Sequence, residues 1–185
     1  MRPLTYVFFL LLISSTCESS TLEDTCKSFA AGHPSIGYNY CVKTFHAEPA
    51  SATADARGLA AIAAKIAGAA AKGTAGRIAA LCASEEDARR RERLGVCAEV
   101  YSDAVDQLGE AAKDIARGED RSTRDALTRL SAALDAPGTC EDAFGEADDA
   151  SPLAAEDAEF RKLATIALGV TALLSPPPSA PGISD

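Results

Sequence analysis

Cysteine is the residue type with the clearest chemical potential in this chain. The six cysteines are Cys17, Cys26, Cys41, Cys82, Cys97 and Cys140. Zinc sites are typically built from closely spaced cysteine pairs that further cysteines or histidines complete. No C-x2-C pair occurs here, and His33 and His46 are the only histidines. The spacing therefore predicts no metal site, and disulfide formation becomes the main alternative if the chain reaches an oxidising compartment.

The residues that could carry catalysis are scattered. A serine hydrolase needs a histidine that a third group orients, but His33 stands beside Pro34 and His46 lies near the end of a predicted helix, with no motif around either. The sequence contains no phosphate-binding loop, dinucleotide fingerprint or H-E-x-x-H motif. Acidic clusters at Glu85–Asp87 and Glu146–Asp149 fall at helix starts and loops, where the helix dipole and solubility account for them. We expect neither an enzyme nor a cofactor.

A run of four arginines is the other chemically suggestive feature. Arg89, Arg90, Arg91 and Arg93 resemble an anion-binding patch, but Glu85, Glu86, Asp87 and Glu92 neutralise them at helical spacing. We interpret the run as a solvated helix face. The whole chain has 27 acidic against 18 basic side chains and a net charge of -9, which argues against nucleic-acid binding, because that function needs a basic surface.

The N-terminal segment has the layout of a secretory signal peptide. A basic start at Met1–Arg2 precedes the apolar run Tyr6–Ile13, and small residues follow. The run is shorter than the about 20 residues that a spanning helix needs. We predict a signal peptide at residues 1–19, a folded domain at 20–174 and a disordered proline-rich tail at 175–185. The protein is then secreted to the extracellular space, with no membrane segment.

Secretion determines how the cysteines are interpreted. Loss of Cys17 with the signal peptide leaves five cysteines, which predicts disulfides and leaves one cysteine either as a free thiol or in an intermolecular bond. Cys26 and Cys41 bracket a break formed by Gly32, Pro34 and Gly37, so a two-helix hairpin closed by one bridge is plausible. Such a bridge would stabilise the fold by about 3 kcal/mol in the chain-entropy model. Spacing alone does not select among the remaining pairings.

Helices are expected throughout the chain that bears these cysteines. Alanine dominates the apolar residues, and alanine favours helices over strands. Short helices are predicted at 21–31 and 38–47. Longer ones are predicted at 54–82, from Ser84 to Gly118, from Ser122 to Pro137 (resuming at 139–146), and from Ser151 to about Leu174, with Ser51 or Thr53 capping the first of them.

Apolar stripes indicate how these helices pack. On the helix predicted from Ser84 to Gly118, apolar residues recur at alternating steps of four and three residues and form one seam. They are Cys97, Tyr101, Ala104, Leu108, Ala111 and Ile115. Another carries Leu59, Ile62, Ile66 and Ala69, and the last carries Phe160, Leu163, Ile166, Val170 and Leu173. No alternating strand pattern appears. The predicted fold is all-α, an up-down four-helix bundle with an N-terminal helical hairpin extension.

Four stretches with distinctive residues follow one another along the chain. They are Thr25-Cys26 with YNYCVK at 38–43, CAEVYSDA at 97–104, TCEDAF at 139–144, and Ser151-Pro152-Leu153 with the helix that follows. Together they resemble the plant invertase and pectin methylesterase inhibitor family over roughly residues 21–174. The stretch ATADARGL at 52–59 is similar to the branch that includes a plane-tree pollen allergen.

The resemblance implies a fold and a disulfide pattern. The family is a four-helix bundle with an N-terminal hairpin, which agrees with the pattern of apolar residues. Its first two cysteines pair, as do its third and fourth, which implies bridges Cys26–Cys41 and Cys97–Cys140 and leaves Cys82 as a free thiol. A bridge between Cys82 and Cys97 is the competing arrangement, because this pair has the same separation as Cys26 and Cys41.

The resemblance also implies that the protein inhibits an enzyme by binding to it and catalyses no reaction itself. Family members bind a cell-wall enzyme one to one and cover its substrate cleft, so pectin methylesterase or invertase is the expected partner of a monomer in the apoplast. Invertase inhibitors carry a Pro-Lys-Phe motif before the third cysteine, and Ala83–Leu94 lacks it. Many pectin methylesterases are basic and would attract an acidic inhibitor.

We therefore favour pectin methylesterase as the target. Inhibition of cell-wall or vacuolar invertase is the first alternative, and a secreted signalling or structural bundle without an enzyme target is the second. Contact residues are not encoded in any motif. Thr139, beside the implied second bridge, is the one residue that we expect to contribute to the contact surface, although helix capping is an alternative role for it.

Overall fold

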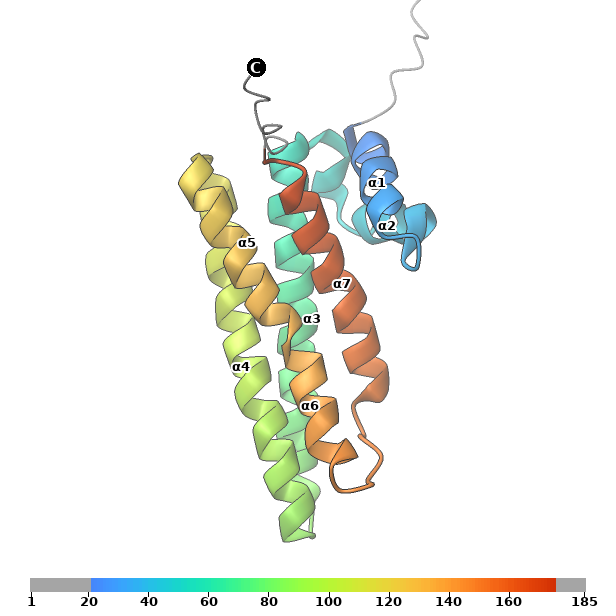
Figure 1. Ribbon diagram of the computed structural model, residues 1–185, viewed down its shortest axis with the longest axis vertical. Coiled ribbons are helices and arrows are strands. Elements are labelled where there is room, and N and C mark those ends of the chain that lie inside the picture. The colour runs from blue at the N-terminus through green and yellow to red at the C-terminus, as the bar shows by residue number, and fades with distance from the viewer. Residues whose placement is uncertain (1–20, 176–185) are drawn as a thin grey trace, which may run out of the picture.

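The computed structural model describes residues 21–175, all of whose regular elements are helices (Figure 1). The predicted signal peptide and nearly all of the proline-rich tail lie outside the described residues. The helices are α1 (Thr21–Gly32), α2 (Gly37–His46), the 3-10 helix η1 (Pro49–Thr53), α3 (Ala56–Ser84), α4 (Ala88–Arg117), α5 (Asp120–Leu134), α6 (Ala136–Gly145) and α7 (Ala154–Ala172).

Four rods form the bundle. The helices α3, α4 and α7 are three of them, and α5 followed by α6 makes the fourth (Figure 1). α4 packs against α3 and α5, and α7 packs against α3 and both parts of the broken rod. The predicted up-down four-helix bundle is confirmed, and the predicted hairpin is formed by α1 and α2.

The core confirms one predicted stripe and corrects another. All six residues of the predicted α4 seam are buried. On α3, Leu59 is buried, but Ile62 and Ile66 are only half-buried and Ala69 is exposed. The buried face of α3 is formed mainly by alanines: Ala60, Ala63, Ala64, Ala67 and Ala71. Small side chains let α3 approach its neighbouring helices closely. A hydropathy pattern does not predict this, because it scores how apolar a side chain is and not how small it is.

The helix starts differ from the predicted caps. Asp55 caps α3 by accepting a hydrogen bond from the Gly58 amide at 2.7 Å, whereas Ser51 and Thr53 lie in η1. Asp87 caps α4 in the same way, with the Arg90 amide at 2.7 Å, and Ser84 is the last residue of α3. An aspartate brings a charged acceptor to the positive end of the helix, which favours it as the cap.

The hairpin is attached to α7 at two points. The ring of Phe29 on α1 is buried, stacks on His33 at 4.6 Å and lies against Gly169 of α7. A Cβ atom at Gly169 would lie only 2.7 Å from Cδ2 of Phe29, so this glycine makes the contact possible. Tyr40 on α2 donates a hydrogen bond to Glu159 of α7 at 2.5 Å. The hairpin therefore extends the bundle as a packed element.

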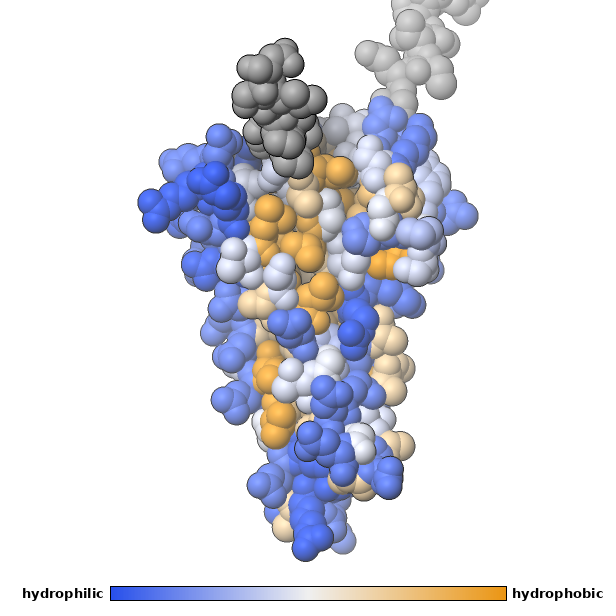
Figure 2. All heavy atoms as spheres, in the orientation of Figure 1, coloured by the Kyte–Doolittle hydropathy of each residue, from blue (hydrophilic) through white to orange (hydrophobic). Residues whose placement is uncertain are grey.

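Among residues 21–175, no helix has the length and apolar content needed to cross a membrane. The surface of the bundle is mixed in character. In Figure 2, apolar atoms run down the middle of the face that α5, α6 and α7 form, and hydrophilic residues flank them on both sides. Such a face offers both apolar area and charge to a partner.

Candidate binding surface

Two disulfides hold the elements around the candidate surface. Cys26 of α1 is bonded to Cys41 of α2, with an S–S distance of 1.97 Å, and Cys97 of α4 is bonded to Cys140 of α6, with an S–S distance of 2.09 Å. All four cysteines are buried. Cys82 is a free, half-buried thiol, so the structure contains the pairing that the family resemblance implies and not the Cys82–Cys97 alternative.

A break in the fourth rod shapes the surface beside the second disulfide. α5 ends at Leu134, Asp135 forms the joint, and Pro137 lies in the first turn of α6. Proline is well placed there, because a first-turn amide has no partner inside the helix and the ring presets φ. The sequence predicts that Pro137 interrupts the helix and that helix resumes at Thr139. In the structure the break lies at Asp135, and Pro137 is part of the first turn of α6.

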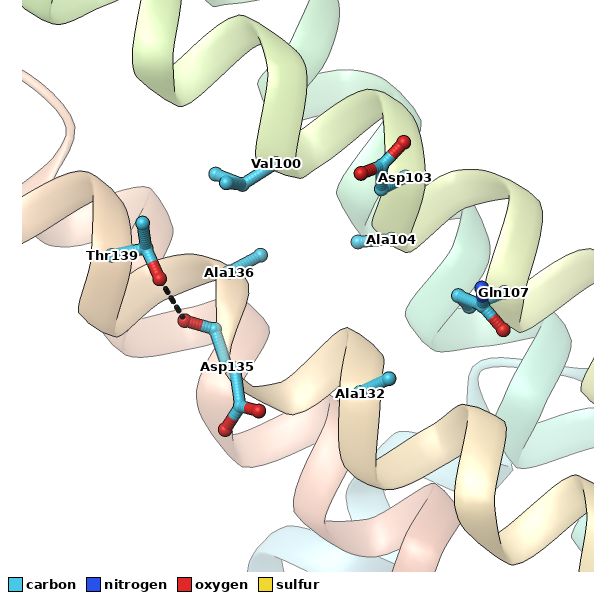
Figure 3. Close-up of a pocket in the computed structure, with 8 residues that line it drawn as sticks. All are labelled: Val100, Asp103, Ala104, Gln107, Ala132, Asp135, Ala136 and Thr139. Carbon is cyan, nitrogen blue, oxygen red and sulfur yellow. Dashed lines mark hydrogen bonds between the residues drawn. The ribbon is translucent and has the colours of Figure 1, made fainter.

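Thr139 lies in the second turn of α6, exposed and next to the buried Cys140. Its Oγ1 donates a hydrogen bond to the carbonyl oxygen of Asp135 at 3.3 Å (Figure 3). This bond joins the side chain to the backbone one turn earlier, so Thr139 is not a helix cap. The residue is thus held in place beside the helix break with its side chain accessible to a partner.

An open groove of about 190 Å³ runs between α4 and the broken rod (Figure 3). One wall comes from α4 and the other from the joint and its flanking turns. The groove is lined by Val100, Asp103, Ala104, Gln107, Ala132, Asp135, Ala136 and Thr139. Small apolar side chains and two exposed carboxylates dominate this lining, and no basic side chain belongs to it. The groove therefore suits a cationic or hydrogen-bond-donating side chain of a partner.

A buried carboxylate links α4 to α5 near this groove. Asp114 of α4 is 3% exposed, and its oxygens accept from Arg117 and from Nε of Arg129 on α5, the latter at 2.9 Å. Arg129 also donates to Gln107, in the groove lining, at 3.3 Å. A charge buried this deeply needs such partners, because an unpaired one would destabilise the fold. Nothing in the sequence pattern distinguishes Asp114, since acidic residues are common on this helix.

The arginine run is not simply a solvated helix face. Arg90 and Arg93 are only 29% and 20% exposed, and they bind Asp149 of the α6–α7 loop at 2.5 and 2.8 Å. Both guanidinium carbons lie 5.5 Å from the ring centre of the buried Phe144. Partial burial acts to raise the pKa of Asp149, but the hydrogen bonds from the two arginines outweigh it and hold the pKa below its usual value.

The histidines make no catalytic arrangement. His33 stacks on Phe29 at the end of α1, and His46 is the last residue of α2. Within residues 21–175, no group of three or more histidine, cysteine, aspartate or glutamate side chains is placed to hold a metal ion. What the surface offers is shape, apolar area and charge rather than a reacting group.

Comparison with protein families gives one match that spans most of the chain. Residues 12–170 match the family model described as plant invertase/pectin methylesterase inhibitor. A Platanus acerifolia protein named "Putative invertase inhibitor" is 34% identical over 175 residues, which cover 91% of this chain and 94% of that protein. The "Pectinesterase inhibitor" of Actinidia deliciosa is 35% identical over 162 residues, covering 87% and 83%.

Among solved structures, the chain resembles a mutant form of a pectin methylesterase inhibitor from Arabidopsis. The TM-score is 0.67, and the superposition covers 85% of this chain and 99% of that one. At 23% sequence identity, this likeness supports the fold alone.

Proposed function

Because the chain belongs to the plant invertase/pectin methylesterase inhibitor family, whose members are inhibitors and not enzymes, we propose that it inhibits pectin methylesterase in the plant cell wall. The protein acts as a monomer, forms a one-to-one complex and covers the substrate cleft of the enzyme with its bundle surface. Residues 1–19 direct its secretion and are removed, residues 20–174 form the inhibitor, and residues 175–185 are a proline-rich tail.

The contact surface of this proposal is the groove beside the second disulfide. The single observation that supports it most is that Asp103 lies on α4 and Thr139 on α6, two helices that Cys97–Cys140 ties together, with Asp135 at the joint just before α6. A surface that is rigid before binding loses little conformational entropy in the complex, which favours affinity. Its acidic character, within a chain of net charge -9, favours a basic partner and speeds encounter with it.

The choice of pectin methylesterase depends on a missing motif. Ala83–Leu94 forms the end of α3 and the start of α4 and contains neither proline nor phenylalanine, so the Pro-Lys-Phe motif of invertase inhibitors is absent from it. In its place, Arg90 and Arg93 are engaged with Asp149. Inhibition of invertase is the second candidate, and the similarity to the plane-tree protein favours it.

One experiment separates the two targets. The purified protein is titrated into a pectin methylesterase and, separately, into cell-wall and vacuolar invertases at mildly acidic pH, with release of methanol and cleavage of sucrose as readouts. We expect stoichiometric loss of methylesterase activity and a one-to-one complex in size-exclusion chromatography. Loss of sucrose cleavage alone would replace the first proposal with the second. Inhibition of neither enzyme by the folded protein would favour a signalling or structural role.

Thr139→Lys tests the contact surface. The variant places a cation where we expect basic groups of the enzyme, so we predict at least a tenfold weaker complex, which corresponds to about 1.4 kcal/mol. Thr165→Lys on α7 is the matched control, because Thr165 makes the same kind of hydrogen bond to a carbonyl one turn back. Equal affinities for Thr139→Lys and the parent protein, at unchanged melting temperatures, would exclude this groove from the interface.

A further inference from the structure

Three polar side chains from three helices meet inside the bundle, away from the groove. Tyr101 of α4 is fully buried and Asp157 of α7 is 2% exposed, while Glu141 of α6 is half-buried. The Tyr101 hydroxyl donates a hydrogen bond to Oδ1 of Asp157, and the Tyr101 ring packs on Phe160 at 5.4 Å. Burying a carboxyl group is costly unless its oxygens find donors or it takes up a proton, so this cluster needs an explanation.

One oxygen of each carboxyl group has no donor. Oδ2 of Asp157 and Oε1 of Glu141 are buried atoms without a hydrogen-bond partner among the described residues. The Glu141 carboxyl group is nevertheless near enough to raise the pKa of Asp157, through a side-chain hydrogen bond and through its charge. Two neighbouring carboxylates cannot both ionise cheaply in a buried site, whereas a carboxylic acid can donate to a carboxylate. A single proton held by the pair would turn one of the two groups into a donor for the other.

The surrounding charges do not neutralise the pair. On α7, Arg161 favours the ionised form of Asp157 through space but makes no ion pair with it. Arg77 of α3 is bound to Glu156 at 2.5 Å, and Tyr40 of α2 is bound to Glu159. Within the described chain, therefore, no basic side chain forms an ion pair with either carboxyl group of the cluster.

The titration of the cluster agrees with this geometry. Burial and then the neighbouring Glu141 raise the pKa of Asp157 to about 7, although the hydrogen bond from Tyr101 and the charge of Arg161 act in the opposite direction. Burial and the contact with Asp157 also raise the pKa of Tyr101, so its hydroxyl remains a neutral donor. The hydroxyl therefore stays protonated whether the carboxyl pair holds its proton or not.

We propose that Glu141 and Asp157 share one proton, and that this pair is a pH-sensitive lock that fastens α6 to α7 in mildly acidic medium and loosens that contact toward neutral pH. Loss of the proton leaves two carboxylates facing each other in the bundle. α6 is the element most affected, because it is short. It also carries Thr139, so a change in α6 would reach the proposed contact surface. The consequence for inhibition rests on the proposed function, whereas the lock itself concerns stability and is tested without any enzyme.

The direction of the pH effect follows from proton linkage. An aspartate in the unfolded chain loses its proton near pH 4. Between that value and the folded value of about 7, the folded protein holds a proton that the unfolded chain does not. The stabilisation is therefore complete below the unfolded pKa and is lost as the pH rises through the folded pKa. The equilibrium constant for unfolding rises by up to tenfold per pH unit in this window.

Urea unfolding of the intact secreted chain between about pH 5 and pH 8 tests the lock. Asp157→Asn keeps an acceptor for Tyr101 and a donor for Glu141 but cannot titrate. We expect the unfolding constant of the parent, relative to this variant, to increase about 50-fold between pH 5 and pH 7, because the folded group is already half deprotonated at the upper pH. Asp142→Asn, which removes an exposed carboxylate one residue from Glu141, is the control and should follow the parent. Parallel pH profiles for the parent and Asp157→Asn would overturn the proposal.

Two further measurements separate a lock from a purely structural role. Tyr101→Phe removes a donor that stabilises the ionised form of Asp157, so we expect the midpoint of the pH dependence to move to higher pH. Carbon NMR of the aspartate and glutamate carboxyl groups in the parent protein needs no variant to fold. A buried carboxyl pair with a midpoint in the neutral range is the expected result. A midpoint near pH 4 for Asp157 would refute the shared proton.

Discussion

Removal of the Cys97–Cys140 bridge should cost the fold about 4 kcal/mol. The bridge closes a loop with a sequence separation of 43, and the chain-entropy model assigns roughly this value to such a loop. Both cysteines are buried, so replacing them together with alanine in a Cys97→Ala/Cys140→Ala variant leaves no unpaired polar atom and no new thiol. Domains are stable by about 5–15 kcal/mol, so this loss is a large fraction of the total.

The assay is thermal and urea unfolding of the parent and the double variant under non-reducing conditions. For a chain of this size, about 4 kcal/mol corresponds to a drop in melting temperature of roughly 8–16 °C. Cys82→Ala is the control and should melt close to the parent, because Cys82 is free. Peptide mapping should show Cys97 joined to Cys140. An unchanged melting temperature in the double variant, or an equal loss in Cys82→Ala, would refute the assignment of this bridge.

Two further substitutions probe the tertiary contacts. Gly169→Ala places a Cβ 2.7 Å from Cδ2 of Phe29, so we expect it to destabilise by about 1–3 kcal/mol and to increase proteolysis of the hairpin. Gly109→Ala, with no atom within 4 Å of its added Cβ, should be neutral or slightly stabilising, and equal melting temperatures for the two variants would contradict this account. Asp149→Asn should lower stability at neutral pH, because the two arginines hold the pKa of Asp149 in the folded protein below its value in the unfolded chain. The ionised Asp149 therefore stabilises the fold at pH values above its pKa in the unfolded chain. The difference from the parent should vanish as the pH falls through the folded pKa of Asp149, and a difference that persists in strong acid would exclude the ion pairs as its cause.

Periodicity along the chain was sufficient to predict the helices and one of the packing faces. The seam from Cys97 to Ile115 is buried as predicted, because large and small apolar residues recur there at the period of a helix with one buried side. On α3 the same reasoning selects Ile62 and Ile66, which are only half-buried. Burial there depends on how closely two helices approach, and this distance is a property of the helix pair rather than of the residue pattern of one helix.

The candidate surface was predictable only in part. Thr139 and the cysteines were found through motifs that resemble a family, and the break at Pro137 was expected, although not its place in the first turn of α6. The pairing of Arg90 and Arg93 with Asp149 could not be seen, because their partner is more than fifty residues away in the chain. Local spacing predicts only the nearby acidic partners, and of these Glu85 does form an ion pair with Arg90, at 3.2 Å.

By itself, the sequence determined an all-helical chain, an acidic surface and the supply of cysteines, since propensity, charge and periodicity are properties of neighbouring residues. The tertiary structure alone decided which surfaces meet. It brought Asp157 beside Tyr101, Phe29 against Gly169, and two arginines onto Asp149. Each of these contacts joins residues on different elements, and its energy depends on burial and distance. Those quantities take their values only when the four rods have packed.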